Sequence, residues 1–169
     1  MSPLEIERFE FRDENQKDKF RFLVVSEEYT HDTIEASYLN HKSFAISRKE
    51  LNNTIQEGDT VYVFIEPPVR EIWYRLKAVD EYYDEEAKED YVVFKVKYKF
   101  KCTKHFKAEN LRKRNLFVPQ RTGNRIPVNL VEFLEKEEFY EKPHLIRKFY
   151  KSPYRWKEIL DDDIIDYDL

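Results

Sequence analysis

This sequence contains very little glycine and cysteine, the residues from which phosphate-binding loops and disulfides are built. It contains two glycines, so a glycine-rich loop that wraps a phosphate is excluded. Its single cysteine, Cys102, excludes an internal disulfide, as is typical of intracellular proteins. No apolar run reaches the roughly 18 residues of a membrane-spanning helix, and no signal-peptide pattern opens the chain. We therefore expect a soluble, cytoplasmic protein.

Metal-ligand and catalytic spacings are also absent from the sequence. The four histidines (His31, His41, His105 and His144) occur in no metal-ligand spacing with one another or with Cys102, whereas a zinc site needs several converging ligands. Acidic residues are numerous, but the Glu85-Glu86 pair and the cluster at Asp161 are typical of solvated charge. No nucleophile lies beside a candidate base. We expect no catalytic residue, no metal, no cofactor and no enzymatic activity.

Charged and aromatic side chains are what the sequence has in abundance. Charged residues make up 38% and aromatic residues 16% of the 169 positions, and this aromatic content argues against disorder because it supplies surface that a core can bury. Abundant Lys and Glu with little Met and Cys resembles the composition of heat-adapted proteins. We expect one domain over residues 1–160, followed at residues 161–169 by an acidic tail or the start of a linker.

Hydrophobic patterning predicts an α+β protein built around one buried strand. Thr60 to Glu66 carries apolar side chains on both faces, and Pro67-Pro68 then withholds two backbone donors and ends the strand. Residues 72–78 and 91–101 alternate between apolar and polar side chains, which predicts strands with one buried face. Phe20 to Ser26 is nearly continuous in apolar residues and predicts a further core strand.

Capping residues and apolar spacing predict the helices. Asp32 and Ser47 are each followed three positions later by Glu, which predicts the N-termini of two helices. Asn129 is the expected N-cap of a third. Further helical segments are expected at residues 108–112, 143–150 and 154–160.

Positive charge is concentrated between Lys95 and Arg125. This segment contains eleven basic residues and one acidic residue, so its net charge is +10, whereas the net charge of the whole chain is −4. Lysines on an exposed strand face also protect a sheet edge, but that explanation does not cover the arginines that follow. Polyanion binding accounts for both and predicts a steep dependence on salt. Phe106 and Phe117 in this segment are candidates for base stacking. The predicted contacts to a nucleic-acid backbone are Lys97, Lys99, Lys101, Lys104, Arg112, Lys113, Arg114, Arg121 and Arg125.

A second group of candidate residues is aromatic. Phe44 follows a loop, Trp73 lies on a charged strand face, and Tyr82 and Tyr83 fall in a predicted acidic loop over Asp80 to Glu86. Taken singly, each is more simply explained as a structural residue. Together they could line a pocket that holds a flat base by stacking.

Two pairs of segments carry a resemblance to a known superfamily. Residues 58–65 followed by 73–79 are similar to the EVE branch of the PUA-like superfamily, in which Gly-Asp opens one barrel strand and the next runs antiparallel to it. Residues 21–34 followed by 43–47 resemble the opening of the related YTH domains: a strand, a turn, a capped helix and a segment of the aromatic cage. The resemblance spans roughly residues 20–139. It implies a small, mostly antiparallel β-barrel flanked by short helices.

The same resemblance implies recognition of a modified, methylated base that is flipped out of a duplex. Phe44 stands where a YTH domain has a cage Trp, Thr33 stands where an acidic residue reads the base edge, and the backbone at Ala45 would lie beside the base. The base pocket so implied consists of Phe44, Ala45, Trp73, Tyr82, Tyr83, Tyr29 and Thr33.

The setting implied is the DNA-targeting domain of a McrB-type, modification-dependent restriction system, in which an EVE-like module precedes a GTP-hydrolysing motor. The expected partner is modified duplex DNA, with further domains C-terminal in a longer chain and no membrane. Two alternatives stay open: an RNA-binding PUA-like module, and a protein-interaction adaptor that uses the basic face.

Mutation can separate the two predicted groups of residues. Replacing Tyr82 and Tyr83 with Ala is expected to weaken binding to modified DNA more than to plain DNA, whereas Arg112→Ala is expected to weaken both alike and to lower the salt dependence. Fluorescence anisotropy with methylated and unmethylated duplexes over a salt series measures both effects. Equal losses from the two kinds of change would mean that the tyrosines only shape their segment.

Overall fold

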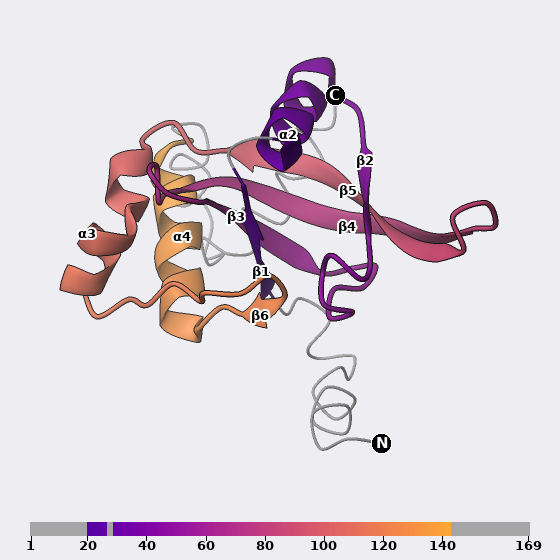
Figure 1. The fold of residues 1–169 in the computed structure, drawn as a ribbon. Coiled ribbons are helices and arrows are strands. Elements are labelled where there is room, and N and C mark those ends of the chain that lie inside the picture. Colours follow the sequence, from indigo (N-terminus) through magenta and orange to yellow (C-terminus); the bar gives the residue numbers. More distant parts are fainter. Residues whose placement is uncertain (1–19, 27–28, 143–169) are drawn as a thin grey trace, which may run out of the picture.

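The computed structural model describes residues 20–26 and 29–142, which form one sheet with helices on both sides (Figure 1). The strands are β1 (Phe20–Val25), β2 (Phe44–Ser47), β3 (Thr60–Ile65), β4 (Ile72–Asp84), β5 (Glu89–Lys99) and β6 (Asn124–Arg125). The helices are α2 (Tyr29–Asn40), α3 (Ala108–Lys113) and α4 (Val128–Tyr140), with a 3-10 helix η2 (Thr103–Phe106). The predicted α+β class is thus confirmed.

The sheet is mixed and open. Its spatial order is β2-β5-β4-β3-β1-β6, and β1 runs parallel to β3 while the other neighbouring strands are antiparallel. β2 and β6 are the outer strands of the described sheet and do not pair with each other. The closed barrel predicted from the resemblance therefore does not form in this part of the chain.

β3 is buried along its whole length, as its sequence predicts. Val61, Val63 and Ile65 belong to a core beneath α2, which we call the α2 core. Tyr62 and Phe64 belong to a second core beneath α3 and α4, which we call the α4 core. Each large apolar side chain buried in this way stabilises the fold by roughly 1.5–3 kcal/mol. A strand in the middle of the sheet with helices on both sides has no face for polar residues.

An irregularity between β3 and β4 moves side chains away from the faces that simple alternation predicts. Val63 pairs with Tyr74 and Phe64 pairs with Ile72, so Trp73 is an extra residue in the ladder. Ile72 consequently lies in the α4 core, whereas Trp73 packs against the α2 core. The prediction that residues 72–78 alternate without interruption, with Trp73 alone on a charged face, is wrong for this reason.

A second bulge divides β5 at Lys97. Consecutive residues of β4 pair with Val96 and with Tyr98, which leaves Lys97 without an opposite residue. Val96 packs against the α2 core, whereas Tyr98 belongs to the α4 core. The predicted single apolar face over residues 91–101 therefore changes sides in the middle. Lys99 consequently faces α2, where it pairs with a glutamate.

The helix predicted after Ser47 does not form. Residues 48–53 are turns, and Asn52 and Asn53 both have a φ of 55°. Two successive left-handed residues cannot continue a right-handed helix, so the capping pattern has nothing to cap. Leu51 and Ile55 are nevertheless fully buried, as their apolar character predicts.

The limits of several elements differ from those predicted. The strand at residues 20–26 and the helical turn at residues 108–112 are confirmed. Asp32 and Asn129 lie within the first turns of α2 and α4 and not at their N-caps. β4 continues through the predicted acidic loop as far as Asp84. The helices expected at residues 143–150 and 154–160 and the acidic tail at residues 161–169 lie outside the described residues.

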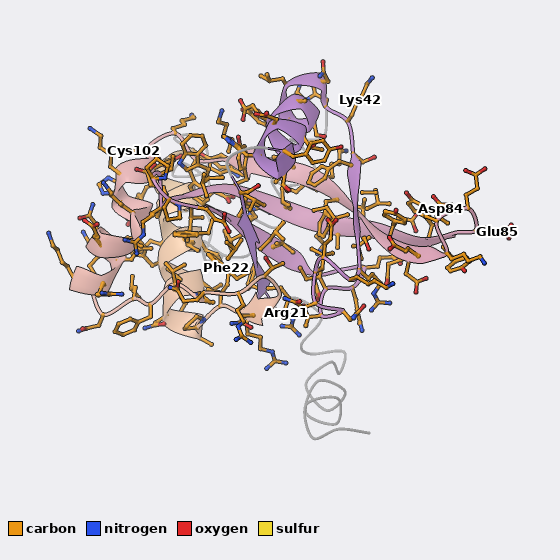
Figure 2. All side chains as sticks on the ribbon, viewed as in Figure 1. Arg21, Phe22, Lys42, Asp84, Glu85 and Cys102 are labelled. Carbon is orange, nitrogen blue, oxygen red and sulfur yellow. The ribbon has the colours of Figure 1, made fainter. Side chains whose placement is uncertain are left out.

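The β4–β5 hairpin projects beyond the rest of the sheet (Figure 1). Its outer part, residues 79–90, lies past the residues of β4 and β5 that pair with β3 and β2, and we call it the arm. The arm carries seven acidic residues and one lysine, a net charge of −6. Asp84 and Glu85 mark its tip in Figure 2.

A buried ion cluster joins β4 to α4. Arg75 donates two hydrogen bonds to the carboxylate of Glu138, at 2.7 and 3.0 Å, and Lys142 donates a third at 2.9 Å. The three side chains are at most 5% exposed. Burial raises the pKa of Glu138, but the charges and hydrogen bonds of Arg75 and Lys142 outweigh burial and hold it below its usual range.

Removing the central carboxylate tests how far the fold depends on this cluster. Glu138→Gln is expected to lower the free energy of unfolding by roughly 3–5 kcal/mol, because it removes the negative charge that two buried cations share. Urea denaturation followed by circular dichroism measures the loss. Glu132→Gln, at an exposed position of the same helix, is the matched control and is expected to change stability by less than about 0.5 kcal/mol. Similar values for both variants would contradict the structural role of the cluster.

Candidate anion-binding pocket

A recess of about 290 Å³ opens between the end of α2 and the second half of β5. We call it the lysine recess, because six of its lining residues are lysines and none is acidic. Figure 2 shows the position of Lys42 just beyond the end of α2. The lining residues are Ser37, Tyr38, His41, Lys42, Lys95, Val96, Lys97, Tyr98, Lys99, Lys101 and Lys142.

The recess exists because β2 is short and α2 ends abruptly. β2 pairs with β5 only as far as Phe94, so β5 continues past its partner from Lys95 onward. α2 ends in a Schellman turn: His41 has a φ of 53°, and the amide of Lys42 donates to the carbonyl of Ser37 at 3.0 Å. This turn brings His41 and Lys42 to the rim of the recess.

Two carboxylates fix the deep side of the recess. Glu138 accepts a hydrogen bond from Lys142, whose amine also lies 4.6 Å from the centre of the Tyr98 ring. Glu141 accepts from the hydroxyl of Tyr98 at 2.6 Å and from the backbone amide of Lys101 at 2.8 Å. The lysines on this side are therefore positioned by groups that lie outside the recess.

A polar network beneath α2 lies behind two of the lining residues, Tyr38 and Lys99. Glu35 accepts hydrogen bonds from the hydroxyl of Tyr74 and from the amine of Lys99, the latter at 2.7 Å. His31 Nε2 lies 3.3 Å from the Tyr74 hydroxyl, and the amine of Lys99 lies 5.5 Å from the centre of the Tyr38 ring. The sequence analysis did not predict this network. The sequence does contain a signal for it, because His31, Glu35 and Tyr38 stand at positions i, i+4 and i+7 and so share one face of α2.

The network shifts two pKa values. Burial raises the pKa of Glu35, but hydrogen bonds from Lys99 and Tyr74 outweigh burial, and the pKa falls below its usual value. Burial, and then the hydrogen bond to Glu35, raise the pKa of Tyr74 well above its usual value. At neutral pH Glu35 is therefore a carboxylate and Tyr74 a neutral donor, as the hydrogen bonds require.

The predicted base pocket is not assembled by the structure. Phe44 is 9% exposed and stacks on Phe94 in the α2 core. Trp73 packs edge-on against His31 and donates from Nε1 to Glu71 at 2.9 Å. These two rings are structural in this fold, because both are held by core or loop neighbours.

The other predicted pocket residues lie elsewhere. Tyr82 and Tyr83 are exposed on the arm, where Tyr82 stacks on Tyr91 with ring centres 5.3 Å apart. Tyr82 follows Trp73 by nine positions along β4, which corresponds to about 30 Å along a strand. The remaining three, Tyr29, Thr33 and Ala45, lie at the start of α2 and in β2. One nucleobase cannot contact all seven residues, so the single pocket predicted from the sequence is corrected here.

The predicted backbone contacts divide into three groups. Lys97, Lys99 and Lys101 line the lysine recess. A second group is exposed around η2 and α3. The third lies at the β6 side of the sheet, four strand spacings or about 19 Å from β5. The second group comprises Lys104, Arg112, Lys113 and Arg114, and the third comprises Arg121 and Arg125.

The two candidate stacking rings differ in exposure. Phe106 is fully buried, whereas Phe117 is exposed.

Over the described ranges, 20–26 and 29–142, no group of three His, Cys, Asp or Glu side chains is placed to hold a metal ion. No helix within these ranges is both long enough and apolar enough to cross a membrane.

Comparison with known proteins yields one distant similarity. No protein-family model matches the sequence, and no curated protein matches it. Among solved structures, the chain is similar to the NMR structure of Rpa0253 from Rhodopseudomonas palustris, at 12% identity and a TM-score of 0.44. The similarity covers 56% of this chain and 70% of that one. A likeness this distant identifies neither a family nor a function.

The lowered pKa of Glu35 predicts an acid-dependent contribution to stability. Because the folded state favours the carboxylate, the contribution is present above the unfolded pKa, near 4.5, and is lost as the pH falls through the folded pKa. The Tm of the wild type should therefore fall more between neutral pH and about pH 3 than the Tm of Glu35→Gln, as measured by differential scanning calorimetry. An equal fall in both proteins would show that Glu35 is not preferentially ionised in the folded state.

Proposed function

We propose that this chain is a nucleic-acid-binding module that holds phosphate in the lysine recess. The observation that carries the proposal is the convergence of six lysines and His41 on one recess with no acidic lining residue. Phosphate contacts from lysine supply most of the sequence-independent affinity of proteins for nucleic acids. An anion placed among these lysines is attracted by several positive charges at once.

The distribution of charge around the recess supports this proposal. Lys99 and Lys142 are paired with glutamates, whereas Lys42 is exposed at the rim. The exposed basic residues of α3 extend the positive surface beyond η2. The acidic arm lies at the opposite end of β5, about 33 Å from Lys99 along the strand. A bound strand therefore meets positive charge at one end of the sheet and is repelled at the other.

The narrower role is proposed on the sequence resemblance alone. In it the chain is an EVE/YTH-type PUA-like module that reads a methylated base by flipping and targets DNA for a McrBC-type restriction system. Since Phe44 is buried and Trp73 and Tyr82 lie far apart, such a base would contact fewer aromatic rings than the resemblance implies. A binding screen with methylated duplex DNA, plain duplex DNA and single-stranded RNA tests this role.

Each outcome of the screen has a distinct meaning. Preference for methylated duplex DNA supports the targeting role. Preference for single-stranded RNA favours the RNA-binding alternative and removes the restriction setting. If no nucleic acid binds even at low salt, a protein-interaction adaptor becomes the better account.

Substitution within the recess tests the proposed phosphate contacts. The double change Lys42→Ala and Lys97→Ala is expected to weaken nucleic-acid binding about tenfold or more and to lower the slope of log K against log salt by about 1.5 to 2, because two phosphate contacts are lost. Fluorescence anisotropy over a salt series measures both. Lys136→Ala, at an exposed position of α4 outside the recess, is the control and should have little effect. Equal effects of both changes would contradict binding in the recess.

A further inference from the structure

We infer that the lysine recess binds a terminal phosphate monoester, the charged end of a nucleic-acid strand, in preference to a phosphate within the backbone. This inference rests on the proposed function and narrows its ligand. It assigns to the recess a role in recognising strand ends, while the exposed basic residues of α3 would contact the backbone that follows.

The first reason is the arrangement of the cations. They reach the recess from three separate segments: Lys42 from the turn after α2, Lys142 from the end of α4, and four lysines from β5 and the residue pair after it. A continuous backbone presents single charges in a row, which an extended basic strip matches. Cations that surround one small volume concentrate the field on one group. A phosphate monoester suits such a site, because it carries about −1.5 to −2 charges at pH 7 and three acceptor oxygens.

The second reason is the small size of the recess. Its volume of about 290 Å³ lies at the lower limit of small-ligand pockets, which span about 300–1,000 Å³. Tyr98 and Lys142 are its most buried lining residues, and the amine of Lys142 is held against Glu138. A phosphate within a backbone has chain attached on both sides, and both continuations must leave the recess. A terminal phosphate has chain on one side only, so a smaller recess is enough to admit it.

The third reason is the aromatic wall. Tyr38 lines the recess, is 37% exposed and has the amine of Lys99 5.5 Å from its ring centre. A phosphate that contacts Lys99 therefore places its own nucleoside within reach of this ring. Stacking on an aromatic side chain is tolerant of base identity, so Tyr38 would hold the terminal nucleotide without selecting its sequence.

Glu35 sets a threshold for binding. Its carboxylate accepts a hydrogen bond from Lys99, so an anion must compete with Glu35 for that amine. A doubly charged monoester competes better than a singly charged diester. If Lys99 turns toward the ligand, Glu35 keeps the hydrogen bond from Tyr74 and is not left without a donor.

The test compares one single-stranded DNA sequence in three forms: with a 5′-phosphate, with a 3′-phosphate, and with hydroxyl groups at both ends. One phosphorylated form is expected to bind at least about tenfold more tightly than the hydroxyl form by fluorescence anisotropy, as charge-assisted hydrogen bonds to an additional charge would give. The double change Lys42→Ala and Lys97→Ala should abolish this gain, and Lys136→Ala should keep it. A nucleoside monophosphate should displace the phosphorylated strand at lower concentration than inorganic phosphate, because it adds the contact with Tyr38.

The remaining outcomes separate this inference from the proposed function. Salt-dependent binding that is equal for all three forms would overturn end recognition while leaving nucleic-acid binding in place. A gain that survives the double change would place the end-binding site elsewhere and would also overturn the inference. Absence of binding for every form overturns end recognition, and it removes the proposed function itself only if the duplex DNA and RNA of the binding screen also fail to bind. Far-ultraviolet circular dichroism of each variant confirms that a lost gain is not lost folding.

Discussion

A carboxylate held between two cations inside the protein fixes the sheet against α4. Glu138 brings Arg75 of β4 and Lys142 at the end of α4 to one point, with all three removed from water. Any slip of the helix along the sheet would separate the buried carboxylate of Glu138 from Arg75, so the cluster favours one arrangement even where its net contribution to stability is small. Lys142 is also a wall of the lysine recess. The geometry of the candidate site is therefore tied to the packing of the core.

The elements that could be predicted are those whose signal is local. β3 was predictable because both its faces are apolar, and the strand at residues 20–26 because its apolar run is nearly continuous. The faces of β4 and β5 were not, since the extra residues Trp73 and Lys97 have ordinary strand character and leave no mark in the pattern. One extra residue moves every later side chain to the other face of a sheet. The closed barrel inferred from the resemblance does not form because the outer strands, β2 and β6, do not pair. The short motifs that carry the resemblance contain no information about the pairing of distant strands.

The candidate site was predictable in part for the same reason. Lys97, Lys99 and Lys101 stood out because their spacing along one strand places them together. Lys42 and Lys142 did not, because each follows a different helix and reaches the recess only through tertiary packing. Conversely, the aromatic residues expected to share a base pocket do not come together. Trp73, Tyr82 and Tyr83 are spread along β4, and Phe44 is buried in the α2 core. The length of β4 keeps Trp73 and Tyr82 apart. The sequence alone did not show that the segment expected to be an acidic loop continues this strand.

The opposed charges at the two ends of β5 give the described part of the chain an uneven distribution of charge along this strand. The acidic arm and the lysine recess are separated by nearly the whole length of the longest hairpin in the described chain. In the field of a polyanion such a molecule experiences a torque before any contact is made, and it turns its lysine-bearing end toward the approaching charge. If the chain binds a polyanion as proposed, the arm would act on the rate and orientation of encounter without contacting the bound ligand.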